Sequence, residues 1–235
     1  MTAAAAAPDP TPVYEVETPE GPGRWHLDLV DSPRAVLALG HGAGGGVTAM
    51  DLALLAGALP AQGISVARFE QPWRLAGRKV ATRPPRLDIA WAAALGDLRA
   101  RPELATAPLV AGGRSAGARV ACRTAEAVGA AAVLCLAFPL HLPGRPEKSR
   151  LAELLTPTGP RLVLQGTRDS FGSADELTSA LTGTEDESIE VVPLPGADHS
   201  FKTPARAPFR PADVRSLIVA STLRLIESVR SAAST

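Results

Sequence analysis

The sequence predicts a single α/β domain in which helices cover both faces of a mainly parallel central sheet. Two observations predict this class: strand-like and helix-like segments alternate along most of the 235 residues, and no internal repeat or low-complexity stretch interrupts them. Alternation of this kind requires helical crossovers between parallel strands. Ligands of such sheets bind outside the carboxyl ends of the strands, so the turns after the strands are where functional residues are expected.

In the first half of the chain, two half-exposed strands precede two buried ones. Alternating apolar and polar residues predict antiparallel strands with one solvated face at residues 13–17 and 25–30. Short apolar runs predict buried strands at 35–39 and 64–69. A helix is predicted at 48–61, where the residues on one face are apolar: Leu52, Leu55, Ala56 and Leu59. A loop rich in proline and arginine at 70–85 and a helix at about 86–100 follow.

The second half continues the same alternation. Residues 109–111 are an apolar run suited to a buried strand, and residues 116–128 are free of proline and rich in Ala, Val and Arg, which suits a helix. Further strands are predicted at 131–138, 161–165 and 189–194, and further helices at 149–155, 173–182 and 211–230. About 22 residues separate Phe138 from Arg161, which leaves no room for a separate cap domain.

Composition narrows the function classes. Hydrophobic residues make up 46% of the chain, charged residues make up 20%, and the formal net charge is +0, which gives no general reason to expect nucleic acid or an anionic membrane as a partner. No apolar run approaches the roughly 20 residues of a spanning helix, and two cysteines make no disulfide framework. Residues 1–12 lack the features of a signal peptide. We therefore expect a flexible lead-in at 1–12, one domain at 13–235 and a cytoplasmic location, as a monomer or a homodimer.

The segment around Ser115 carries the chemistry. Gly113-x-Ser115-x-Gly117 joins a predicted strand to a predicted helix, which is typical of the nucleophile elbow of α/β-hydrolases. Such a turn holds the serine in a sparsely populated backbone conformation, at a helix N-terminus that favours an oxyanion. The alternative is a glycine–serine helix cap with no chemistry.

A serine nucleophile needs a histidine base and an acid, which in this fold follow in the order serine, acid, histidine. Of the four histidines, only His141 and His199 follow Ser115. The single acidic residue between Ser115 and His141 lies inside the predicted helix, so His199 is the expected base. Asp169 is the expected acid, because it directly follows a buried strand. The other aspartates before the base fit a helix first turn, an acidic loop or a direct neighbour of the histidine: Asp175, Asp186 and Asp198.

Further residues are expected around this site. The backbone N–H groups of Ala43 and Ala116 are predicted to form the oxyanion hole. His41 either braces the glycine-rich turn or transfers protons, and a phosphate loop at 42–46 lacks the required Gly-Lys-Ser/Thr ending. Substrate contacts are expected from His41, Phe138, Arg68 and His141, although His141 also fits a structural role. The basic segment 68–86 is either a solvated rim or an attraction for carboxylate-bearing substrates. No metal or cofactor is expected.

From about Val36 to Ser200 the chain resembles the α/β-hydrolases related to testis-expressed protein 30, in the dienelactone-hydrolase-like branch. The shared stretches are His41-Gly42-Ala43-Gly44, Arg68-Phe69, residues 83–87, Gly112-Gly113-Arg114-Ser115, residues 138–148, residues 165–172 and Asp198-His199. The resemblance implies a Ser115–Asp169–His199 triad. Three departures lie near the expected pocket: Ala116 replaces Met, Ala118 replaces Gly, and Glu70-Gln71-Pro72-Trp73 replaces Asn-Phe-Pro-Tyr. Dienelactone hydrolases proper carry Cys where this chain has Ser115.

These observations predict a serine hydrolase that acts on a small ester-like substrate, namely a short-chain carboxylic ester, a lactone or a thioester. Two alternatives remain open. One is a non-catalytic scaffold of the same fold that binds protein partners, as some relatives act in protein complexes. The other is an acyltransferase or peptidase that uses the same three residues.

Overall fold

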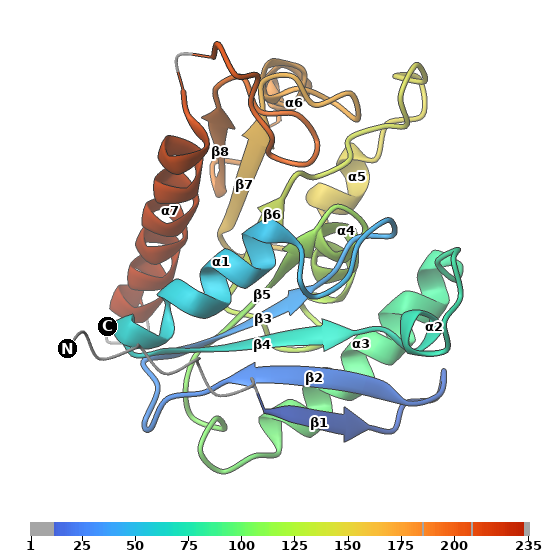
Figure 1. Cartoon of the computed structure of the whole chain (residues 1–235), viewed down its shortest axis with the longest axis vertical. Helices are drawn as coiled ribbons and strands as arrows, with labels where there is room; N and C mark the ends of the chain where they lie inside the picture. The colour runs from blue at the N-terminus through green and yellow to red at the C-terminus, as the bar shows by residue number, and fades with distance from the viewer. Residues whose placement is uncertain (1–11, 185, 208, 233–235) are drawn as a thin grey trace, which may run out of the picture.

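The computed structural model describes residues 12–184, 186–207 and 209–232, so all but the last residue of the expected lead-in lies outside the described part. One eight-stranded sheet runs through this part of the chain in the order β1-β2-β4-β3-β5-β6-β7-β8 (Figure 1). Its strands are β1 (Val13–Val16), β2 (Gly23–Asp28), β3 (Ala35–Gly40), β4 (Ile64–Glu70), β5 (Leu109–Arg114), β6 (Ala132–Leu136), β7 (Arg161–Gly166) and β8 (Ile189–Leu194). The predicted fold class is confirmed.

The sheet is mainly parallel, with antiparallel pairing at one end. β2 pairs antiparallel with both β1 and β4, and the pairs from β4 to β8 are parallel. β3 lies between β4 and β5, so the chain leaves β3 toward one edge of the sheet and later returns to its other side. Such a point of reversal opens a crevice at the carboxyl ends of the strands. The turns after β3 and β5 border it.

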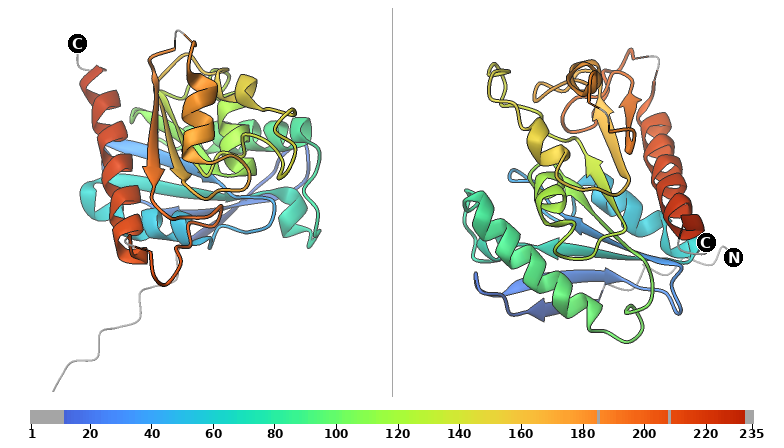
Figure 2. Two further views of the ribbon diagram at one scale, coloured as in Figure 1. Left: turned by 90° about the horizontal axis from the view of Figure 1, so that it is seen from above. Right: turned by 180° about the vertical axis from the view of Figure 1, so that it is seen from behind.

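Helices cover both faces of the sheet. On one face, α1 (Met50–Ala58) packs against α7 (Pro211–Ala232), and on the other α4 (Ala116–Thr124) packs between α3 (Pro84–Arg99) and α5 (Leu151–Leu154), with α6 (Ala174–Leu181) over β8 (Figures 1 and 2). The short helix α2 (Pro72–Leu75) and a 3₁₀ turn at Pro60–Gln62 fall in segments predicted as loop and helix. Between β6 and β7 the structure has a single short helix, α5. This segment therefore forms no separate cap domain, as the sequence predicts.

Two hydrophobic cores correspond to the two faces. Leu52 and Leu55 of α1 and Ile218 and Ile226 of α7 belong to one core. The other contains an aromatic cluster whose buried members are Trp25, Phe69 and Trp91, with ring centroids 4.9–6.0 Å apart. Across the residues that the structure describes, none of the helices has the length and apolar character needed to cross a membrane.

Candidate active site

Ser115 lies at the sharp turn between β5 and α4. Its backbone has φ 51° and ψ −109°, a region that residues with a side chain rarely occupy and that costs of order 1–3 kcal/mol. The Ser115 amide donates to the Leu136 carbonyl of the neighbouring strand at 2.9 Å, which holds the turn in place. As the residue directly before α4, Ser115 is placed beside the unpaired amides of a helix N-terminus.

Two glycines make this turn possible. A Cβ atom on Gly113 would lie 2.5 Å from the Gly40 carbonyl oxygen and 2.7 Å from the carbonyl carbon of Gly117, and a Cβ atom on Gly117 would collide with the Gly40 carbonyl. The backbones of β3, β5 and α4 therefore meet at a distance that no side chain allows. This close approach brings the turn after β3 up to Ser115.

The structure brings Ser115, His199 and Asp169 together in one hydrogen-bonded chain. His199 Nε2 lies 3.0 Å from Ser115 Oγ, and His199 Nδ1 lies 2.8 Å from Asp169 Oδ2. Because an ionised carboxylate only accepts, Nδ1 carries the ring proton and Nε2 is free to accept the hydroxyl proton. The Asp169 side chain is fully buried and also accepts from the Phe171 amide at 2.8 Å and from Gln165 Nε2 at 3.1 Å.

His199 is also fixed by two residues that the sequence analysis gave no role. Its ring stacks on Phe171, with centroids 4.2 Å apart and planes at 29°. Its backbone carbonyl accepts a hydrogen bond from the Arg114 guanidinium. Arg114 is in turn paired at 2.6 Å with Asp51 of α1, whose side chain is fully buried. The position of Arg114 inside the elbow motif, next to the serine, was the available signal.

The residues expected to form the oxyanion hole border one narrow crevice. Ala43, in the turn after β3, and Ala116, the first residue of α4, both line this cavity of about 10 Å³, which has room for one water molecule at most. The first amides of a helix have no acceptor within the helix, so the Ala116 N–H is available to a ligand. Ala43 also borders the open cleft at Ser115.

His41 braces the turn after β3. Its Nε2 accepts from the Gln71 amide at 3.1 Å, so Nδ1 carries the proton and donates to the Gly42 carbonyl at 2.8 Å. Burial is the main cause that lowers the pKa of His41 below its ordinary 6.5, and the Arg74 charge acts in the same direction. A neutral ring with both nitrogens engaged has no hydrogen bond to offer a substrate, and the His41 ring lines the same narrow crevice as Ala43 and Ala116.

The other three expected substrate contacts lie away from the cleft. Arg68 donates to the Val47 carbonyl and pairs with Asp28, each at 3.1 Å. The Phe138 side chain is fully buried in the core. His141 Nδ1 lies 2.9 Å from the Leu142 carbonyl, and Nε2 lies 3.6 Å from Glu176. Among the described residues, none of these three side chains lines the cleft at Ser115.

The other aspartates that were candidates for the acid of the triad lie or bind elsewhere. Asp198 accepts from the amides of Ser200 and Lys202, so it shapes the loop that carries His199. Asp186 pairs with Arg161 at 2.5 Å, and Asp175 lies in the first turn of α6. These contacts leave Asp169 as the carboxylate at the imidazole.

An open cleft of about 490 Å³ lies over Ser115. Its walls are the glycine-rich turn after β3, the start of α1, and the loops that carry Phe171 and His199; Lys202 and Arg114 are its cations. Within the described residues, no group of three or more His, Cys, Asp or Glu side chains could hold a metal ion.

The sequence and the structure are both similar to known proteins. A family model described as an alpha/beta hydrolase domain matches residues 33–227, whereas no curated protein matches the sequence. Solved structures share the fold. XC6422 from Xanthomonas campestris, described as a serine hydrolase without a lid, is 22% identical with a TM-score of 0.68, over 94% of this chain and 98% of its own. A serine hydrolase homologue from Coxiella burnetii is 18% identical, with a TM-score of 0.70 over 89% and 96%. Est1E from Butyrivibrio proteoclasticus is 13% identical, with a TM-score of 0.70 over 92% and 99%.

Proposed function

The chain belongs to the alpha/beta hydrolase family, and from this premise we propose that it is a serine hydrolase that cleaves an ester-like bond through Ser115, His199 and Asp169. One observation carries the proposal: His199 lies within hydrogen-bond distance of both Ser115 Oγ, at 3.0 Å, and Asp169 Oδ2, at 2.8 Å. Nucleophile, base and orienting acid thus stand in the order that serine acyl transfer needs.

In the proposed reaction, Ser115 Oγ attacks the substrate carbonyl while His199 Nε2 takes the hydroxyl proton. Asp169 holds the imidazole in the required tautomer and stabilises the imidazolium that forms. The N–H groups of Ala43 and Ala116 hold the negative charge that develops on the carbonyl oxygen. His199 then donates the proton to the leaving oxygen, and an acyl group remains on Ser115.

The second half of the reaction returns the enzyme to its starting state. A water molecule enters through the open cleft, His199 removes one of its protons, and the resulting hydroxide attacks the acyl carbon. The acid product leaves when the tetrahedral intermediate collapses and Ser115 regains its proton from His199. The substrates that we propose are carboxylic esters, lactones or thioesters with a short acyl group.

A fluorophosphonate probe and Ser115→Ala test this proposal. Labelling should occur on Ser115 of the wild type, and Ser115→Ala should lower kcat for 4-nitrophenyl acetate by about five to six decades. Ser179→Ala, an exposed serine on α6, should leave labelling and turnover unchanged. More than a tenth of the activity in Ser115→Ala would refute the assignment.

The same experiments separate the alternatives. Folded wild-type protein that forms no adduct would indicate a scaffold that binds partners. Product analysis would reveal the other two activities. Transfer of the acyl group from an ester to an added alcohol would indicate an acyltransferase, and cleavage of an amide would indicate a peptidase. In the proposed reaction, by contrast, the acyl donor is an ester and the acyl acceptor is water.

A further inference from the structure

Two unequal spaces lie at the turn that carries Ser115 and Ala116. The open cleft of about 490 Å³ contains His199, Phe171 and Lys202 in its walls. The narrow crevice of about 10 Å³ is lined by Ala116, Gln71 and Trp73, among others. Ala43 borders both spaces. Among the described residues, neither His199 nor Phe171 lines the crevice.

The proposed chemistry assigns a substrate part to each side. The leaving oxygen must reach His199 Nε2 to receive its proton, so the alcohol part lies in the open cleft. The carbonyl oxygen must reach the amides of Ala43 and Ala116. The third substituent of the carbonyl carbon, the acyl group, is assigned to the remaining side, next to the crevice that Ala116 and Trp73 line.

Gln71 and Trp73 form part of the crevice wall. Trp73 is only 3% exposed, and its ring lies 5.6 Å from the His41 ring. Gln71 is fixed at both ends, because its amide donates to His41 Nε2 at 3.1 Å and its side chain donates to the Leu87 carbonyl at 3.2 Å. The chain on this side of the crevice is thus held rigidly to the turn that carries Ala43.

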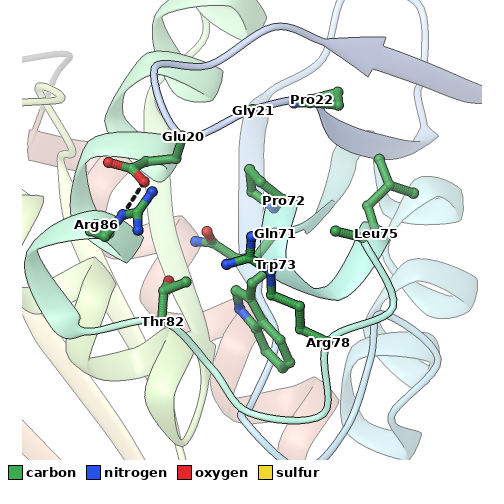
Figure 3. Close-up of a pocket in the computed structure, with 11 residues that line it drawn as sticks. Glu20, Gly21, Pro22, Gln71, Pro72, Trp73, Leu75, Arg78, Thr82 and Arg86 are labelled. Carbon is green, nitrogen blue, oxygen red and sulfur yellow. Dashed lines mark hydrogen bonds and ion pairs between the residues drawn. The ribbon is translucent and has the colours of Figure 1, made fainter.

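A second cavity of about 320 Å³ lies next to this wall (Figure 3). Gln71 and Trp73 line it as well, so the same two side chains form a wall of both spaces. Figure 3 shows the Trp73 side chain between Thr82 and Arg78, with the Glu20–Arg86 ion pair and Leu75 on opposite sides of the cavity. The cavity is large enough for several methylene groups.

We propose that Trp73 is the partition that limits the acyl group to a short chain, and that the cavity of Figure 3 is an extension of the acyl site that this side chain closes. The inference rests on the proposed function. The substrate class that follows is a short-acyl ester, with no comparable limit on the alcohol part, because the alcohol side is open.

Two substrate series and one inhibitor series test the partition. 4-Nitrophenyl acetate, butyrate and hexanoate vary the acyl part, and the acetates of 4-nitrophenol and 2-naphthol vary the alcohol part. Methyl-, butyl- and hexylboronic acid form reversible tetrahedral adducts with the serine, so their inhibition constants report chain length without turnover. In wild type, hexanoate should have a kcat/KM at least about 10-fold below acetate, and hexylboronic acid should bind more weakly than methylboronic acid. The two acetates should differ less than acetate and hexanoate do.

Trp73→Ala should join the two spaces. We expect the hexanoate-to-acetate ratio of kcat/KM to rise about 10-fold or more, with a matching gain for hexylboronic acid. Trp73→Leu should give an intermediate hexanoate-to-acetate ratio of kcat/KM. Because leucine leaves a smaller gap than alanine, this variant should fold even if Trp73→Ala does not. Leu75→Ala, which lines only the outer cavity, should leave the ratio at its wild-type value.

The outcomes separate this inference from the proposed function. If wild type hydrolyses hexanoate as well as acetate and its boronic acid affinities do not fall with length, the partition does not exist. If both Trp73 variants fold and retain the wild-type ratio, Trp73 is not the limit. If no boronic acid or fluorophosphonate reacts at Ser115, the proposed function fails first, and the inference fails with it.

Discussion

Replacing Asp51 with asparagine should weaken both the fold and the placement of His199. One Asp51 oxygen accepts from Arg114 at 2.6 Å, and the other accepts from the Leu52 amide at 3.0 Å. Arg114 also donates to the His199 carbonyl. Asparagine keeps the size of the side chain and removes its charge, which leaves an Arg114 side chain that is only 11% exposed without a counter-ion.

The size of the effect follows from this burial. Loss of one partner of a buried ion pair costs about 3–5 kcal/mol, and the hydrogen bond that asparagine retains returns about 1 kcal/mol. We therefore expect the free energy of unfolding to fall by about 2–4 kcal/mol. For a chain of this length, each kcal/mol lowers Tm by about 2–4 °C, so Tm should fall by about 4–16 °C in thermal unfolding followed by circular dichroism.

Kinetics provide the second measurement for Asp51→Asn. The loop that carries His199 should become less well placed, which lowers kcat for 4-nitrophenyl acetate by about 10-fold or more with a smaller change in KM. Asp31→Asn makes the same chemical change at an exposed loop position and should stay within about 0.5 kcal/mol of wild type. A Tm for Asp51→Asn within about 2 °C of wild type would show that the buried pair does not stabilise the fold.

Two further predictions concern backbone clearance and pH. Gly117→Ala should destabilise the fold by about 1–3 kcal/mol, because its Cβ would meet the Gly40 backbone; Gly96→Ala, at an open position of α3, should instead stabilise it by about 0.5–1 kcal/mol, and urea unfolding of both variants measures the difference. The pKa of His41 is lowered in the folded state, mainly by burial, so the unfolded chain binds more protons and stability falls as the pH drops below 6.5. His41→Gln should reduce that slope in unfolding curves at about pH 5–7, and an unchanged slope would contradict the assignment.

Much of the fold could be predicted from the sequence, because buried parallel strands are short apolar runs that sit between helical segments. The predicted strand at 64–69 and helix at 86–100 agree with β4 and α3 to within two residues. The helix predicted at 48–61 is instead α1 followed by a 3₁₀ turn, since Pro60 cannot continue the helix. The helix α2 begins at a proline inside a segment with no helical periodicity, so no pattern marked it.

The candidate site was predicted unevenly, for a physical reason. Ser115, Asp169 and His199 each follow a strand, and chain order alone could assemble them, although their catalytic role stays a prediction. The expected substrate contacts depended on the direction in which each side chain points, and residue spacing does not encode that direction. Arg68 turns toward Asp28 of the adjacent strand, and Phe138 turns into the core. The link from Asp51 through Arg114 to His199 joins three separate elements, so no local pattern could show it.

Two of the positions at which the sequence differs from the group that it resembles line one cavity; the comparisons show the alpha/beta hydrolase family and do not confirm that group. Ala116 replaces a larger residue beside the serine, and Trp73 stands where the group has a tyrosine, yet both line the same crevice. In the proposed partition, a small residue at 116 leaves room next to the nucleophile and the indole of Trp73 limits the length of the acyl group. Because both residues line one cavity, their effects on acyl preference should be coupled rather than additive. We therefore expect the double variant Ala116→Met/Trp73→Tyr to differ in acyl preference from the sum of the two single variants.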